Sequence, residues 1–172
     1  MIAQLGPSQP KVERLGGADA EAFRELRLEG LKKHPEAFGA SWAEEASLST
    51  GDFERRLNSS AVFGVRNADQ TLDGVVGFFV IGGEKQRHKG VLWGMYVRPE
   101  MRNLGIGWAL VRQVITYAKP TVEELRLTVL PSNETARRLY SRAGFEKYGT
   151  EPRALKLGDI YLNEDLMALK LR

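Results

Sequence analysis

The sequence predicts an α/β fold of the α+β type, with one central sheet covered by helices, and three observations support this class. At 172 residues the chain suits one well-filled domain rather than two. Its 42% hydrophobic and 27% charged residues are typical of a globular protein. Segments with strand-like and helix-like periodicity alternate, and no repeat or linker divides them. We therefore expect a single domain over residues 1–172, with residues 1–9 as a loose N-terminal segment.

The first half of the chain is expected to supply three strands and two helices. Apolar residues at helical spacing follow the candidate N-cap Asp19, and Pro35 ends that helix. Residues 38–46 are turn-rich and contain two aromatics, which suggests a mobile lip. The expected elements are a strand at 11–15, a helix at 19–34, a small helix at 52–57, and strands at 61–66 and 74–81. The turn-like residues between the last two strands predict an antiparallel hairpin.

The second half is expected to continue the alternation of strands and helices. A strand at residues 90–97 runs into a glycine loop, and Gly105 and Gly107 open a helix that Pro120 stops. The next helix starts at residues 131–133, and Gly144 closes it as a C-cap. The apolar stripes of the two helices are Ile106, Leu110, Val111, Val114 and Ile115, and then Ala136, Leu139, Tyr140 and Ala143. The remaining strands are expected at 124–130, 145–155 and 160–171.

Composition excludes several classes of function. The chain has no cysteine and two histidines, which rules out a thiolate metal site or a cysteine nucleophile and argues against any bound metal. The longest apolar run, residues 74–83, is too short to cross a membrane, which takes about 20 residues. Residues 1–10 lack a signal-peptide pattern, so we expect a cytoplasmic protein. A net charge of +3 is too mild to indicate nucleic-acid binding, but it suits a phosphate-rich ligand.

The loop at residues 102–107 is the strongest candidate for a binding site. Free amides and the helix dipole make a helix N-terminus suited to phosphate, and Gly105 and Gly107 allow close approach. Arg102 adds a cation that can form paired contacts with phosphate oxygens. A plain strand-to-helix turn with a surface arginine is the alternative. A dinucleotide fingerprint fails because Leu110 stands where a glycine or alanine is needed, and the Gly-Lys-Ser/Thr of a Walker loop is absent.

The longer string at residues 95–107 resembles the signature of the GNAT superfamily of N-acetyltransferases. That resemblance implies a mixed, mostly antiparallel sheet of six to seven strands with a splayed central pair, and about four helices on both faces. It also implies acetyl-CoA as co-substrate, with backbone groups of Met95, Tyr96 and Val97 binding the pantetheine arm. The residues it places around the pyrophosphate are Arg102, Asn103, Leu104, Gly105, Ile106, Gly107 and Trp108.

A second constellation lies on the later helix. Asn133 and Tyr140 are seven positions apart, or two helical turns, so they share one side. Taken alone, they could be an N-cap and a core residue. The segment 133–145 is similar to the GNAT pattern N-x-x-A-x-x-L-Y-x-x-x-G-F, which implies that Asn133 contacts the cofactor and that Tyr140 lies beside the thioester sulfur. Tyr140 is then the expected general acid toward the CoA thiolate, and hydrogen bonding can suffice, since a phenol pKa of about 10 exceeds a thiol pKa of about 8.5.

The acceptor amine needs a base, because an alkylamine with a pKa of about 10.4 is mostly protonated at neutral pH. Several family members use a glutamate on a central strand, where this chain has Trp93, Gly94 and Met95 on one strand and Thr128 on the other. No carboxylate is apparent there. Glu100 lies in the turn toward the pyrophosphate, and a loop histidine, His88, reaches the site only if its loop folds inward. We therefore leave the base unassigned, with a water chain as the default.

The resemblance places the acceptor near Phe38 and Trp42, which stand close to Glu44 and Glu45 in the sequence. The alternative is an amphipathic helix with Trp42 in the core and two solvated glutamates. Residues 159–171 look like the closing strand of a substrate-covering hairpin. The prediction is direct transfer of acetyl from acetyl-CoA to a primary amine of a small molecule or peptide.

Two other classes stay open, an acyl-CoA sensor or binding module and a nucleic-acid binder. The resemblance is compatible with a homodimer, although no sequence feature specifies one.

Overall fold

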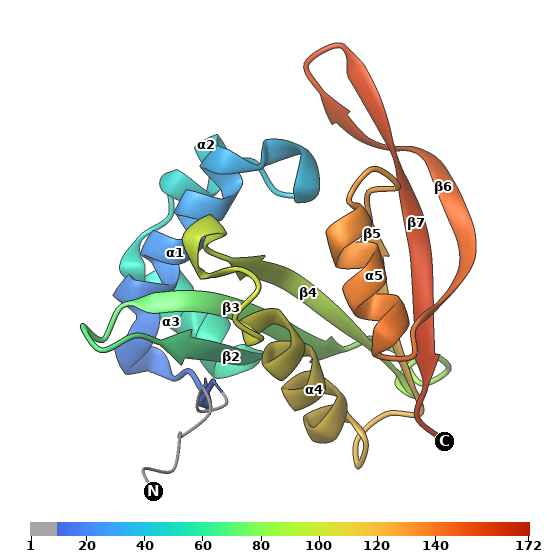
Figure 1. Cartoon of the computed structure of the whole chain (residues 1–172), viewed down its shortest axis with the longest axis horizontal. Helices are drawn as coiled ribbons and strands as arrows, with labels where there is room; N and C mark the ends of the chain where they lie inside the picture. Colours follow the sequence, from blue (N-terminus) through green and yellow to red (C-terminus); the bar gives the residue numbers. More distant parts are fainter. Residues whose placement is uncertain (1–9) are drawn as a thin grey trace, which may run out of the picture.

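The computed structural model describes residues 10–172, which contain one seven-stranded sheet in the order β1-β2-β3-β4-β5-β7-β6 (Figure 1). Only β4 and β5 pair in parallel, and all other neighbours are antiparallel. The strands are β1 (Val12–Arg14), β2 (Ala61–Arg66), β3 (Leu72–Val80), β4 (Lys89–Val97), β5 (Glu124–Val129), β6 (Glu146–Leu157) and β7 (Ile160–Lys170). The expected mixed, mostly antiparallel sheet is confirmed.

Helices cover both faces of the sheet. They are α1 (Ala20–Lys33), α2 (Trp42–Ala46), α3 (Thr50–Ser59), α4 (Ile106–Ala118) and α5 (Glu134–Arg142). Residues 42–46, expected to be turns, form the short helix α2 because Ser41 and Glu44 cap it reciprocally. A similar capping box between Ser49 and Asp52 starts α3 two residues before the expected helix.

The sheet separates two hydrophobic clusters, as the alternation of side chains along a strand requires. On one side α1 and α3 pack over the sheet, and Val62 and Val75 point toward them. On the other side α4 and α5 pack over Phe63 and Val76, the direct sequence neighbours of those valines. Strands β2 and β3 are therefore buried on both faces, which explains their nearly continuous apolar sequence.

The central strands β4 and β5 diverge after a short stretch of pairing. Their parallel register covers only Lys89–Val91 opposite Glu124–Arg126. Further along β4, the register against β3 shifts near Gly94, which has a φ of 63°. A bulge of this kind bends the strand and increases its twist. The splayed pair expected from the family pattern is confirmed, and the opening between β4 and β5 holds the candidate site.

The last two strands form a long hairpin whose tip extends beyond the rest of the sheet (Figure 1). Strand β7 inserts between β5 and β6, with Thr128 of β5 opposite Leu166. This arrangement brings residues close to the end of the chain next to the central opening. Within residues 10–172 no helix is both long and apolar enough to cross a bilayer.

Candidate active site

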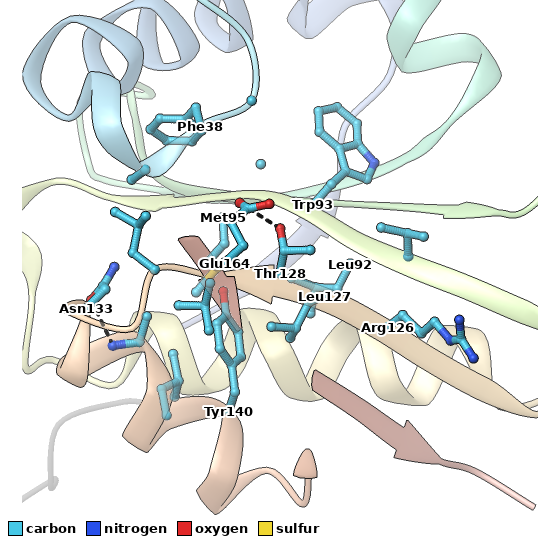
Figure 2. Close-up of a pocket in the computed structure, with 18 of the residues that line it drawn as sticks. Phe38, Leu92, Trp93, Met95, Arg126, Leu127, Thr128, Asn133, Tyr140 and Glu164 are labelled. Atoms are coloured by element: carbon cyan, nitrogen blue, oxygen red, sulfur yellow. Dashed lines mark hydrogen bonds between the residues drawn. The ribbon is translucent and has the colours of Figure 1, made fainter. Parts of the chain in front are cut away.

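A cleft of about 450 Å³ opens where β4 and β5 separate (Figure 2). Its walls come from α1 and the following turn, from β4 and β5, from α5 and from the β6–β7 hairpin. The residues that matter for chemistry are Arg27, Phe38, Trp93, Met95, Arg126, Thr128, Asn133, Tyr140, Tyr148 and Glu164.

The glycine loop lies at the start of α4 and presents free amides. Gly105 is the N-cap with a φ of 80°, and Asn103 also has a left-handed φ of 64°. In the described part of the chain, the amides of residues 103–108 donate to no protein acceptor, and the first bond runs from Ala109 to the Gly105 carbonyl. Convergent amides at a helix N-terminus attract an anion. The loop therefore has the geometry of a phosphate site.

Two arginines flank this loop. Arg102 donates to the Val97 carbonyl at 3.2 Å, and its Nη2 lies 3.3 Å from Nε2 of His34. Its side chain is exposed, so it can turn toward a phosphate. Arg142 of α5, which sequence analysis did not single out, stacks 4.5 Å above the Trp108 ring at the start of α4. Only the packing of α5 beside α4 reveals this second cation.

The edge of β4 that faces β5 has no strand partner beyond Val91. This edge includes Met95, Tyr96 and Val97, whose backbone was expected to bind the pantetheine arm. Met95 lines the cleft, and Tyr96 is buried with its hydroxyl donating to Glu29 at 3.1 Å. The pKa of Tyr96 is raised to about 12, mainly by burial and secondly by this hydrogen bond to Glu29. The side chain of Tyr96 is therefore part of the core, while the backbone at this position has no strand partner on the side that faces β5.

Asn133 and Tyr140 both line the cleft from α5, as their spacing predicted. The Asn133 Oδ1 accepts from the Ala136 amide at 3.1 Å, so the N-cap interpretation is correct, and its amide nitrogen remains available to a ligand. Figure 2 shows the Tyr140 hydroxyl pointing from α5 into the opening between the strands. The ring is 5% exposed and packs edge-on against Phe145. Burial raises the pKa of Tyr140, which keeps the phenol protonated as a donor.

Phe38 also lines the cleft, held by the cation–π contact of Arg27 at 4.9 Å. Arg27 forms a bidentate ion pair with Glu45, both oxygens at 3.0 Å, and Arg56 adds a third bond at 3.1 Å. Burial opposes ionisation of Glu45, but the arginines outweigh it and lower its pKa. Glu45 is therefore engaged in a buried ion pair, and the alternative that made it a solvated glutamate is wrong.

Trp42 does not join Phe38 in this cleft. It is 45% exposed, and Lys32 lies 5.8 Å from its ring. The alternative that places Trp42 in the core is wrong, because the short helix α2 turns this residue outward. Its assignment to the acceptor site gains no support from the cleft geometry. His88 and Glu100 also lie outside the residues that line the cleft.

The cleft does contain a carboxylate, and the sequence did not reveal it. Glu164 of β7 lines the cleft, and the Thr128 hydroxyl donates to its Oε1 at 2.9 Å (Figure 2). As the sequence indicated, neither β4 nor β5 contributes a carboxylate to the cleft lining, because Glu164 belongs to β7. Glu164 was missed because it comes from the neighbouring strand, and only the β5–β7 register brings it beside Thr128. The described residues contain no cluster of three or more groups that could hold a metal.

Comparison with known proteins identifies the family. The model of the acetyltransferase (GNAT) family matches residues 23–145, more than half of the chain. The protein is a member of the GNAT acetyltransferase family. No curated protein matches the sequence.

Solved structures share the fold at low sequence identity. A GNAT-family acetyltransferase from Streptococcus pneumoniae is 20% identical, with a TM-score of 0.82 over 94% of this chain and 99% of that one. A ribosomal-protein-alanine N-acetyltransferase from Brucella melitensis is 19% identical, with a TM-score of 0.77 over 93% and 99%. A phosphinothricin acetyltransferase from Sinorhizobium meliloti, solved in complex with acetyl-CoA, is 16% identical, with a TM-score of 0.79 over 94% and 88%.

Proposed function

We propose that this protein transfers acetyl from acetyl-CoA directly to a primary amine of a small molecule or peptide. One observation carries the proposal: the amide-rich loop at the start of α4 lies, through Gly107, against Met95 and Leu139, which line the cleft that also contains the Tyr140 phenol. A ligand with a pyrophosphate at one end and a thioester at the other fits this separation of an anion site from a proton donor.

The described residues fit acetyl-CoA along its length. The free amides of residues 103–108 and the exposed Arg102 suit the pyrophosphate, and the open edge of β4 suits the amides of pantetheine. Asn133 has a free amide group on the opposite wall. The Sinorhizobium meliloti relative with acetyl-CoA bound supports the same choice of ligand.

Tyr140 acts on the leaving group. Attack of the amine nitrogen on the thioester carbonyl expels a thiolate, and a buried protonated phenol can donate a hydrogen bond to it. Burial raises the pKa of Tyr140 further above that of a thiol. Complete transfer of the Tyr140 proton to the thiolate is therefore unfavourable unless another group gives a proton back to the phenol. The nitrogen loses a proton as the amide forms and can return it to Tyr140.

The chain has no cysteine, so an acetyl-cysteine intermediate is excluded and transfer is direct. The attacking amine must first lose a proton. Neither β4 nor β5 places a carboxylate in the cleft, so no carboxylate on these two strands takes that proton, and water on the open side of the cleft can relay it.

The test is CoA-thiol release measured against peptides, polyamines, amino acids and aminoglycosides, with the acetylated product identified by mass. The proposal expects thiol and acetylated amine in equal amounts for at least one class. Acetyl-CoA binding by calorimetry without product from any class would instead indicate a sensor or binding module. Salt-sensitive DNA or RNA binding that CoA does not affect would indicate a nucleic-acid binder.

A further inference from the structure

Glu164 is an uncompensated negative charge in the cleft wall. In the part of the chain that the structure describes, it forms no ion pair, and its hydrogen bond is the one from Thr128 at 2.9 Å. Its sequence neighbour Asp165 points to the opposite face of β7, where Lys147 lies at 2.7 Å and Arg137 at 3.3 Å. Asp165 is therefore neutralised by cations within the protein, whereas Glu164 faces the cleft.

The strand register adds a second negative charge beside it. Glu151 of β6 lies directly opposite Glu164 of β7, and paired residues in an antiparallel ladder share one face. Like charges in directly opposite positions destabilise a sheet. Neither glutamate has an ion-pair partner among residues 10–172. A cation arriving from solution would relieve this repulsion.

The two arginines that line the same cleft are paired elsewhere, Arg27 with Glu45 as described above and Arg126 with Glu124. Arg126 of β5 pairs with Glu124 at 2.6 Å, and its guanidinium lies 5.3 Å from the Tyr148 ring. Glu124 is at the end of β5 where it still pairs with β4, away from Thr128. Arg126 is therefore engaged with Glu124 and leaves the charge of Glu164 for a ligand.

We propose that Glu164 receives the ammonium group of the acceptor and takes its proton, directly or through one water. This inference rests on the proposed N-acetyl transfer and names its acceptor class: alkylamines that are cationic in solution. Thr128 is a positioning residue, because its hydroxyl fixes one carboxylate oxygen of Glu164 and leaves the other to the substrate.

The proton balance of the reaction is complete with these groups. One ammonium proton passes to the Glu164 carboxylate, and the freed nitrogen forms a bond to the thioester carbonyl carbon. Collapse breaks the carbon–sulfur bond, and the thiolate takes the Tyr140 proton. The nitrogen returns its second proton to Tyr140, and Glu164 releases the first one to water on the open side. The products are an N-alkylacetamide, CoA thiol and one proton.

The decisive comparison is Glu164→Gln against wild type, with the best alkylamine from the thiol-release panel and with an aromatic amine that is uncharged at neutral pH. We expect kcat/KM for the alkylamine to fall by about 10²-fold or more, in the range of general-base contributions, with a clearly smaller loss for the aromatic amine. The activity of Glu164→Gln toward the alkylamine is expected to rise with pH, following the free-amine fraction. Wild type is expected to be active already near neutral pH, because Glu164 takes the ammonium proton.

Matched controls separate chemistry from folding. Glu123→Gln removes an exposed carboxylate outside the cleft and is expected to leave kinetics unchanged. Acetyl-CoA affinity and melting temperature of Glu164→Gln are expected to equal those of wild type. Thr128→Val is expected to lower kcat/KM for the alkylamine, and Thr128→Ser to restore it, because serine keeps the hydroxyl donor.

The outcomes separate the inference from the function on which it rests. If wild type acetylates no amine, the proposed function fails and the role of Glu164 fails with it. If wild type acetylates alkylamines and Glu164→Gln keeps the same kcat/KM and pH profile, only the role of Glu164 is overturned. Equal losses for the charged and uncharged amines would also overturn it, because ammonium recognition predicts a difference.

Discussion

Replacing Glu45 by glutamine tests how strongly the buried ion pair between α1 and α2 stabilises the fold. Glu45 is 5% exposed and accepts three charge-assisted hydrogen bonds, two from Arg27 and one from Arg56. Glutamine has nearly the same shape, but it has one acceptor oxygen and no charge. The buried Arg27 guanidinium then loses its counter-ion while Phe38 and Trp93 still cover it.

The expected loss of stability follows from those contacts. Hydrogen bonds to charged groups contribute about 1.5–3 kcal/mol each, and glutamine removes about two of the three. Arg56 is partly exposed, so its share is reduced by solvent screening. We expect a loss of about 3 kcal/mol, at the lower end of the range for breaking a buried pair. For a domain of this size that lowers the melting temperature by roughly 6–12 °C.

The assay is thermal unfolding followed by circular dichroism, with Glu25→Gln as control for an exposed glutamate on the adjoining helix α1. The folded-state pKa of Glu45 is lowered, so its contribution is complete above the unfolded-state pKa and disappears as pH falls through the folded-state pKa. The difference between wild type and Glu45→Gln is thus largest near neutral pH and shrinks on acidification. A loss below about 1 kcal/mol at pH 7 would refute the assignment of a strong buried pair.

Three further predictions concern the Tyr140 phenol, the glycine loop at residues 102–107, and Asp165 of β7. Tyr140→Phe is expected to lower kcat by about 10²-fold or more with nearly unchanged acetyl-CoA affinity, measured by thiol release and calorimetry, and unchanged turnover would refute the role as acid. Gly105→Glu places an anion and a strained φ in the loop, so calorimetry is expected to show weaker binding of CoA but not of dephosphorylated pantetheine; equal affinities would mean that the loop does not hold pyrophosphate. The Lys147 hydrogen bond chiefly lowers the pKa of Asp165, against the opposing effect of burial, so Asp165→Asn is expected to destabilise the protein at pH 7 and progressively less below the unfolded-state pKa of about 3.9. Urea unfolding of wild type and Asp165→Asn, at pH 7 and below that pKa, measures the difference in their free energies of unfolding. A difference that does not change with pH would contradict the prediction.

Local patterns predicted the geometry of the glycine loop and of α5 well. The free amides at residues 103–108 depend on one turn and the start of one helix, both encoded by neighbouring residues. Asn133 and Tyr140 lie on a single helix, so their common direction followed from helical spacing alone. Helix and strand boundaries agreed within a few residues for the same reason, except where serine caps created α2 and lengthened α3.

The cleft wall that contains Glu164 and the Arg27–Glu45 pair could not be predicted because it depends on contacts between distant segments. Glu164 reaches the cleft through the pairing of β7 with β5, and no local pattern encodes that register. Glu45 has the sequence context of a surface glutamate, yet the packing of α2 on α1 buries it against Arg27. Trp42 shows the reverse, a large aromatic at the start of the same helix that stays 45% exposed.

The divergence of β4 and β5 gives the molecule a mechanical property as well as a binding site. The two strands pair through only Lys89–Val91 and Glu124–Arg126, so the sheet is a pair of half-sheets joined at one end. A ligand lying along the free edge of β4 would act as a missing strand and bridge the halves. Because any ligand that binds only the folded state raises its stability with concentration, acetyl-CoA bound in this way would stabilise the arrangement of the two halves. Loading the donor and shaping the acceptor side would then be one coupled event.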